Sequence, residues 1–198
     1  MTPEEENEIA ELMRAAREKA RGYADHFGWA TDRDIEEWGV VNALSACLES
    51  ENKSFFKNIK RRGRLNDPPD CEALDIDGRR IAIEVTELVD GKAIQAYKAG
   101  AIYEWADWDK NSFMDLLSRL ITRKDSRYTE LKEPPYTGGY VVVVFTAEPM
   151  LDRLTIESYL EGHKFDRPKY ISRVFLLVSY DPDPSIRQCP YYELEFND

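Results

Sequence analysis

The most informative alternation of apolar and polar positions lies between Asp67 and Asp90, where two short runs of strand character flank the pair Asp77-Gly78. An Asp-Gly pair supplies the positive φ angles of a two-residue type I′ turn, so the sequence predicts a β-hairpin. In the second arm, strand periodicity places three branched residues on one face and Glu84 with Thr86 on the other. The branched residues are Ile81, Ile83 and Val85.

The register of this hairpin follows from its turn. If Asp77 and Gly78 are the two turn residues, antiparallel counting pairs Cys71 with Glu84. Asp70, at the start of the first arm, then lies at the level of Glu84 and Val85. Two carboxylates are therefore predicted to meet at one end of the hairpin.

Helical and strand periodicities predict the remaining elements. Helices are expected over residues 2–23, from a cap at Thr31 or Asp32 to about residue 50, and over 92–104, 112–131 and 155–161, with Ser112 capping the fourth. Strands are expected over 140–146, 172–180 and 192–196, and the unbroken valine run of the first is typical of a parallel strand buried on both faces. The predicted fold is α/β, a mixed β-sheet flanked by helices with an N-terminal helical extension. Residues 1–198 would form one domain, with N-terminal helices over 1–50 and a core over 67–198.

Composition narrows the class of protein. The chain has 198 residues, with 42% hydrophobic and 33% charged residues, which is typical of one well-solvated globular domain. Its longest apolar run, residues 140–145, is too short to span a bilayer, and the sequence MTPEEENEIA has no signal-peptide pattern, so we expect a cytoplasmic protein. Three cysteines without metal-ligand spacing are expected to be reduced, and two scattered histidines do not favour a zinc site.

The charge distribution bears on nucleic-acid binding. A net charge of −11 argues against sequence-blind association, which depends on phosphate neutralisation by Lys and Arg. Residues 53–64 nevertheless form a basic run without an acidic residue, directly before Asp67. The residues of this run that are candidates for binding nucleic acid are Lys57, Lys60, Arg61, Arg62 and Arg64.

The pair Pro69-Asp70, followed after the hairpin by Glu84-Val85-Thr86, resembles the PD-(D/E)XK nuclease superfamily. It is similar to a bacterial branch with Glu-x-Thr in place of Glu-x-Lys, since the final Lys of the motif is Thr86 here. The resemblance implies a restriction-endonuclease-like core and a Mg²⁺ or Mn²⁺ ion held by Asp70, Glu84 and the backbone carbonyl of Val85. It also implies a Glu on a helix before the hairpin, for which Glu36, Glu37 and Glu49 are candidates, with solvation as the ordinary alternative.

Lys124 is the candidate for the cation missing at Thr86. It lies three residues after Ile121 and four before Tyr128, on the apolar face of the predicted helix. One interpretation is a lysine that lays its stem on the core and extends to solvent. The other is an ammonium directed at Asp70 and Glu84, since the superfamily includes members whose Lys has migrated to this helix. Arg123 and Arg127 are either phosphate contacts or surface charges.

Two classes of function remain open from the sequence. The first is a metal-dependent endonuclease or phosphodiesterase, a hydrolase in which Asp70, Glu84, Thr86 and Lys124 form the catalytic site. The alternative is a catalytically inactive module of the same fold that acts as an antidote or accessory protein through a protein partner or a second copy of itself. A purely structural interpretation of Glu84 is an edge-strand charge paired with Arg80. An α/β domain of unassigned role remains if the hairpin register is wrong.

Overall fold

The structure is a computed structural model that describes residues 11, 33–102, 105–179 and 189–197. The predicted helix over residues 2–23 therefore lies, apart from residue 11, outside the described residues. In the described part of the chain, six strands form one mixed sheet in the order β1-β2-β3-β4-β5-β6. The strands are β1 (Phe56–Arg61), β2 (Cys71–Asp75), β3 (Arg80–Glu87), β4 (Gly139–Thr146), β5 (Arg173–Val178) and β6 (Tyr191–Glu193).

The sheet combines an antiparallel and a parallel part. Strands β1, β2 and β3 form an antiparallel meander, β3, β4 and β5 are parallel neighbours, and β6 is antiparallel to β5. The predicted α/β class and mixed sheet are confirmed. The prediction of a buried parallel strand over residues 140–146 is also confirmed, because β4 is parallel to β3 and β5 and is buried along nearly its whole length.

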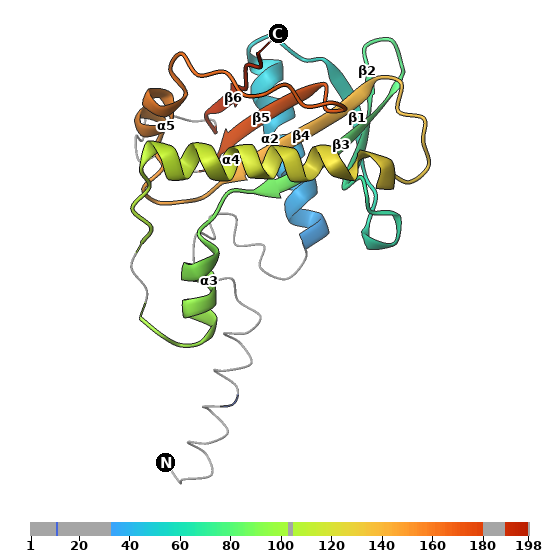
Figure 1. Cartoon of the computed structure of the whole chain (residues 1–198). Helices are drawn as coiled ribbons and strands as arrows, with labels where there is room; N and C mark the ends of the chain where they lie inside the picture. Colours follow the sequence, from blue (N-terminus) through green and yellow to red (C-terminus); the bar gives the residue numbers. More distant parts are fainter. Residues whose placement is uncertain (1–10, 12–32, 103–104, 180–188, 198) are drawn as a thin grey trace.

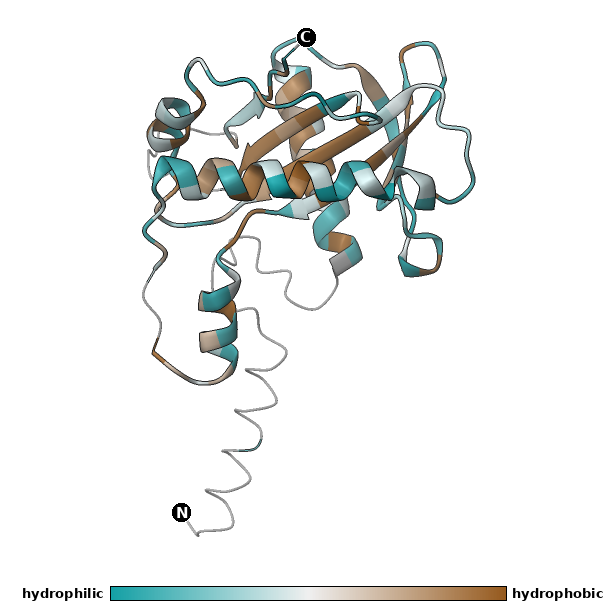
Figure 2. Ribbon diagram, in the orientation of Figure 1, coloured by the Kyte–Doolittle hydropathy of each residue, from teal (hydrophilic) through white to brown (hydrophobic). Residues whose placement is uncertain are grey.

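Helices α2 (Arg33–Ser50) and α4 (Lys110–Ser126) cover opposite faces of the sheet (Figure 1). The other helices are α3 (Gly91–Lys98) and α5 (Arg153–Leu160), with 3₁₀ turns η1 (Arg64–Asn66) and η2 (Arg127–Glu130). Helix α4 lies in the connection between the parallel strands β3 and β4. Figure 2 shows its hydrophobic positions against the sheet and its hydrophilic ones outward.

Each face has its own apolar core. On one face, Val40, Val41 and Leu44 of α2 pack in the same cluster as Ile81, Ile83 and Val85 of β3. On the other, Phe113, Leu117 and Ile121 of α4 pack in a cluster with Ala82, Val142 and Val144. The predicted alternation of β3 is therefore correct, and it leaves Glu84 and Thr86 on the α4 face.

The register of the β2–β3 hairpin differs by one residue from the prediction. Cys71 pairs with Ile83 rather than with Glu84, and residues 76–78 form a three-residue loop with Gly78 at φ 82°. The Asp75 carboxylate accepts hydrogen bonds from the backbone N–H groups of Asp77 and Arg79, which stabilises this longer loop. An Asp-Gly pair suits both loop lengths, because a three-residue loop also needs a left-handed residue at its end.

Strand β1 was not predicted. Its residues lie within the basic run, and only Phe56 is buried, so hydrophobic periodicity gives no signal there. Its register is interrupted between Lys57 and Lys60, and Asn58 has φ 57°. Charged side chains and an irregular register are typical of an edge strand.

Several predicted helix boundaries were also wrong. Asp109 rather than Ser112 caps α4, since its carboxylate accepts from the N–H and the hydroxyl of Ser112. The α-helix ends at Ser126 and continues only as η2, α3 ends at Lys98, and α5 begins one residue after its cap, Asp152. Among the described residues, none of the helices is both long and apolar enough to cross a membrane.

Candidate functional site

The structure brings together Asp70, Glu84 and Lys124, which lie far apart in the sequence. The Lys124 Nζ lies 3.7 Å from Asp70 Oδ2 and donates a hydrogen bond to Glu84 Oε2. The side chains of Asp70 and Lys124 are each 3% exposed and that of Glu84 is fully buried. Of the two interpretations of Lys124, the geometry matches the ammonium directed at the carboxylates.

The corrected hairpin register explains why the two carboxylates meet. With Cys71 opposite Ile83, continuing the pairing by one residue places Asp70 opposite Glu84. Residues directly opposite in antiparallel strands direct their side chains to the same face. The predicted register would have set Asp70 opposite Val85 and hence on the other face, so the one-residue difference is what builds the site.

Asp70 is fixed by the backbone of β3. It lies one residue before Cys71, the first residue of β2 paired with β3, and its Oδ2 accepts a hydrogen bond of 2.7 Å from the Val85 N–H. The N–H and C=O of one strand residue face the same neighbouring strand, so the Val85 carbonyl also faces the Asp70 side. The geometry thus directs all three candidate oxygen ligands, Asp70, Glu84 and the Val85 carbonyl, to one region.

Lys124 is held by the end of α4. The Tyr140 hydroxyl donates to the Lys124 carbonyl at 2.9 Å. The adjacent Asp125 carboxylate accepts from three successive backbone N–H groups of residues 169–171, at 3.0, 2.7 and 3.1 Å. These contacts fix the height and rotation of the last helical turn and therefore direct the Lys124 side chain at the sheet.

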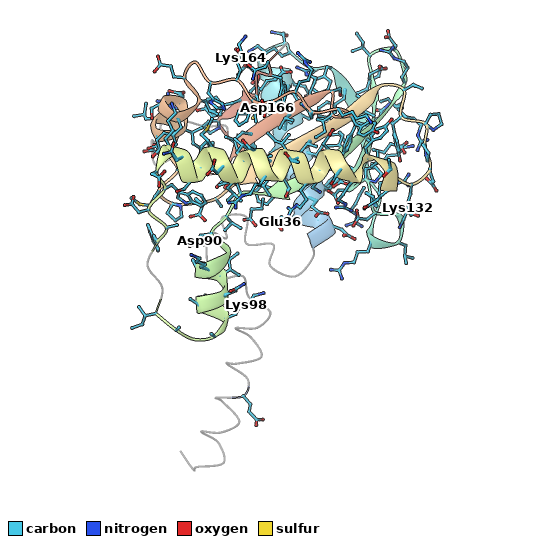
Figure 3. The ribbon with its side chains drawn as sticks, in the orientation of Figure 1. Glu36, Asp90, Lys98, Lys132, Lys164 and Asp166 are labelled. Atoms are coloured by element: carbon cyan, nitrogen blue, oxygen red, sulfur yellow. The ribbon has the colours of Figure 1, made fainter. Side chains whose placement is uncertain are left out.

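The segment before Asp70 is tied to the segment after α4. Lys132, labelled in Figure 3, donates its backbone N–H to the Pro68 carbonyl at 2.8 Å and its Nζ to the Leu65 carbonyl at 3.1 Å. The hairpin and the α4 region are therefore joined by these hydrogen bonds of Lys132 as well as by the contacts of Lys124 with the two carboxylates.

Two arginines of the same helical region complete the cluster. Arg127, 30% exposed, places Nη1 3.4 Å from Glu84 Oε2 and Nη2 3.6 Å from Asp67 Oδ1. Arg123 Nη2 donates to the Thr86 hydroxyl at 3.0 Å. Arg127 was not assigned to the carboxylates from the sequence, because it begins η2, where the helical period that placed Lys124 has ended.

Burial governs the electrostatics of the cluster. It raises the pKa of the Glu84 carboxyl above its usual value, the Lys124 ammonium opposes this shift, and the negative charge of Asp70 adds to it. Within the part of the chain that the structure describes, Glu84 Oε1 is buried and has no hydrogen-bond partner. Glu84 thus presents one oxygen to two cations and keeps a second, buried oxygen without a hydrogen bond to any described residue.

The candidate donors Asp70, Glu84 and the Val85 carbonyl are all oxygen atoms. Among the described residues, no group of three or more His, Cys, Asp or Glu side chains is placed so that it could hold a metal ion. Two carboxylates and a carbonyl suit Mg²⁺ or Mn²⁺, since Mg²⁺ usually takes one or two protein carboxylates and keeps several waters. The unsatisfied Glu84 Oε1 is a fitting ligand atom for such an ion.

Of the three helical glutamates considered from the sequence, Glu37 is the buried one, while Glu49 is exposed. Burial raises the pKa of the Cys71 thiol to about 12, and the negative charges of Asp70 and Glu37 add to this shift. Glu37 therefore acts electrostatically on the start of β2, beside Asp70.

The basic run divides into three environments. Lys57, Lys60 and Arg61 are exposed on β1, and Arg64 is exposed on η1. Arg62 instead has a side chain only 9% exposed, with Nη1 3.2 Å from Glu72 and 2.7 Å from Glu133. It is not the open surface cation that the sequence suggested.

The edge-strand interpretation of Glu84 is wrong. Strand β3 lies between β2 and β4, and Arg80 pairs with Glu72 at 2.6 Å instead of with Glu84.

No family model, curated protein or solved structure matches this chain.

Proposed function

We propose that the protein is a divalent-metal-dependent nuclease with a restriction-endonuclease-like core, in which Asp70, Glu84 and Lys124 form the catalytic site. The observation that carries the proposal is the contact of the Lys124 ammonium with both carboxylates in a buried setting. A lysine buried beside two acids of a hairpin is costly to keep, and such perturbed ionisable groups concentrate at functional sites.

The topology supports the same proposal. A hairpin joined by a helical crossover to a buried strand is the α/β core of the nuclease fold that the sequence resembles. The β2–β3 hairpin, α4 and β4 have that arrangement, and the candidate residues lie on the hairpin and on the crossover helix.

Asp70, Glu84 and the Val85 carbonyl would hold Mg²⁺ or Mn²⁺, which supplies an acidified water and neutralises charge on the substrate phosphate. The Lys124 ammonium orients the attacking water or donates to the pentacovalent phosphate as negative charge develops. Burial keeps bulk water from these groups, which strengthens each electrostatic contact. Thr86 fixes the Arg123 guanidinium through its hydroxyl.

A substrate would reach this site beside Arg127 and Asp67. Their side chains are 30% and 39% exposed, whereas Glu84 has no exposure. A phosphate that enters beside Arg127 competes with Glu84 for the guanidinium, because phosphate is a good bidentate partner for Arg. Substrate binding thereby releases Glu84 Oε2 from one of its two cations.

The test is cleavage of single- and double-stranded DNA and RNA with Mg²⁺ or Mn²⁺, comparing the wild type with Glu84→Gln and Asp70→Asn. Both variants keep the shape of the side chain and remove its charge. We expect cleavage by the wild type and at least a 100-fold loss in each variant, as is ordinary when a group acting in the transition state is removed. Asp77→Asn is the control, since Asp77 is an exposed residue of the same hairpin loop.

The outcome against the proposal is equally sharp. Wild-type protein that cleaves none of the four substrates and shows no Mn²⁺ binding by calorimetry, or binding that Glu84→Ala leaves unchanged, would favour the inactive module. In that case the buried cluster is a structural ion-pair network that fixes α4 on the hairpin.

A further inference from the structure

A cavity of about 510 Å³ lies against the antiparallel part of the sheet, beside residues of β1, β2 and β3. It is lined by Lys60, Arg61, Arg62, Asn66, Glu72, Arg80 and Glu133. Four cations and two carboxylates give this cavity a positive lining in a chain whose net charge is −11. Its sign is therefore opposite to that of the protein as a whole, which indicates an anionic ligand.

The arginines of the cavity are held in place before any ligand arrives. The Arg80 guanidinium lies 4.6 Å from the centre of the Tyr136 ring, with Nη2 2.6 Å from Glu72 and Nη1 donating to the Glu133 carbonyl at 2.7 Å. Arg62 reaches the same two acids through Nη1. The Glu72 carboxylate thus accepts from both guanidinium groups, and Glu133 binds Arg62 through its carboxylate and Arg80 through its backbone carbonyl. These contacts hold the two groups side by side, and the fixed fork geometry of Arg suits phosphate oxygens.

Arg62 retains unused hydrogen-bonding capacity. Its side chain is 91% buried, and its Nε and Nη2 have no hydrogen-bond partner among the residues that the structure covers. A buried donor left unpaired costs about 1–3 kcal/mol. An anion with several acceptor oxygens in this cavity would satisfy these groups after a small shift of the guanidinium.

The cavity adjoins the carboxylate site. Arg62 donates its backbone N–H to the Asp70 carbonyl at 3.1 Å, which continues the pairing of Lys60 with Glu72 and places the Arg62 side chain on the same face as Asp70. Neighbouring strands lie about 4.8 Å apart, so Arg62 is one strand spacing from Asp70 and two from Glu84. A chain carrying repeated phosphates could therefore contact both places at once.

We propose that this cavity binds a phosphate group, and that the phosphate belongs to the nucleic-acid strand whose neighbouring phosphodiester lies at Asp70 and Glu84. The strand assignment depends on the proposed nuclease function, whereas the phosphate site itself does not. Lys60 and Arg61, exposed at the cavity, make the first electrostatic contacts, and Arg62 with Arg80 forms its fixed interior.

The test measures binding of a fluorescein-labelled single-stranded DNA octamer to the full chain in EDTA, over a series of salt concentrations. Lys60→Gln and Arg61→Gln are the informative variants, because both side chains are exposed and their loss leaves the Glu72 and Glu133 ion pairs intact. Each should reduce the slope of log K against log salt by about 0.7, the single-strand value per phosphate contact. At about 0.1 M salt this corresponds to a roughly five-fold weaker affinity per variant.

Lys53→Gln is the matched control, since it removes one positive charge from the same basic run at an exposed residue that does not line the cavity. We expect its slope to equal that of the wild type. Unchanged slopes for both Lys60→Gln and Arg61→Gln, or an equal loss in Lys53→Gln, would overturn the proposal.

A second arm separates the source of the phosphate. Inorganic phosphate is titrated into the wild type and the two variants with detection by ³¹P NMR line width. Weak binding that Lys60→Gln and Arg61→Gln both reduce, together with the salt-slope result, supports a strand phosphate in the cavity. Phosphate binding without octamer binding would overturn the strand assignment.

The result is independent of catalysis. Octamer binding is measured in EDTA, where the proposed metal-dependent cleavage does not occur. Reduced slopes in a protein that cleaves nothing would support the phosphate site and reject the nuclease function. Cleavage with slopes that neither Lys60→Gln nor Arg61→Gln alters would reject the site alone.

Discussion

The sharpest energetic test of the buried cluster is the pair Lys124 and Glu84. Lys124→Met removes the ammonium and keeps most of the stem, so its main effect is to leave Glu84 buried beside Asp70 with Arg127 as its remaining cation. Removing one partner of a buried ion pair costs about 3–5 kcal/mol. Total stabilities of about 5–15 kcal/mol mean that the variant can still fold, but with a large part of its free energy of unfolding lost.

Protonation limits this cost. Without the ammonium, the pKa of Glu84 rises further, because Lys124 is the main group that lowers it. In the pH range where Glu84 is neutral in the variant and charged in the wild type, the two proteins differ in their free energy of unfolding by an amount that falls with pH. The fall is up to about 1.4 kcal/mol for each unit of lower pH. The loss should therefore be larger at higher pH and shrink as the pH falls.

The assay is urea unfolding followed by tryptophan fluorescence, for the wild type, Lys124→Met, Glu84→Gln and the double variant. We expect the double variant to lose less than the sum of the two single losses, with an interaction energy of about 2–3 kcal/mol. Lys110→Met, an exposed lysine at the start of the same helix, should change the free energy of unfolding by no more than about 0.5 kcal/mol. Additive single losses, or a Lys124→Met loss as small as that of the control, would refute the reasoning.

Three further predictions concern pH, positioning and reactivity. Burial raises the pKa of the Glu84 carboxyl, so the folded protein binds its proton more tightly than the unfolded chain does. The free energy of unfolding should therefore fall as the pH rises from 4.5, the ordinary value, through the raised pKa. Glu84→Gln should remove this dependence on pH in urea titrations. Asp125→Ala leaves three backbone N–H groups without the carboxylate that accepts from them. We expect the free energy of unfolding to fall by about 2–4 kcal/mol in the same assay and Mn²⁺-supported cleavage to weaken. Unaltered cleavage would show that Asp125 does not position Lys124. Burial raises the pKa of Cys71 to about 12, so iodoacetamide at pH 8 should leave it unmodified in the native protein and modify it in urea, as read by mass spectrometry.

The parts of the fold that periodicity dictates were predictable from the sequence. Strands β3 and β4 follow from branched residues that are buried on one face or on both, and Lys124 follows from helical phase along α4. Arg127 could not be placed in this way, because it begins the 3₁₀ turn where the 3.6-residue period ends. Helical phase therefore predicted one cation of the site and not the other.

Two other features depend on tertiary structure that local patterns do not encode. Strand β1 forms because β2 offers it an edge, and its basic residues carry no strand pattern of their own. The hairpin register is decided by the Asp75 carboxylate, which stabilises a three-residue loop that the Asp-Gly pair permits but does not require. The sequence thus predicted that two acids meet, but the register that it suggested would have separated them.

The hydrogen bond from the Val85 N–H to Asp70 also gives the site a spectroscopic signal of its own. Neighbouring amides of β3 exchange with solvent only when the sheet opens, whereas the Val85 amide is held by a side chain. Any event that draws the Asp70 carboxylate away, such as the arrival of a cation or a phosphate, would shift the Val85 amide resonance and speed its exchange without disturbing the ladder beside it. One backbone proton would then report occupancy of the site in a protein that is otherwise unchanged.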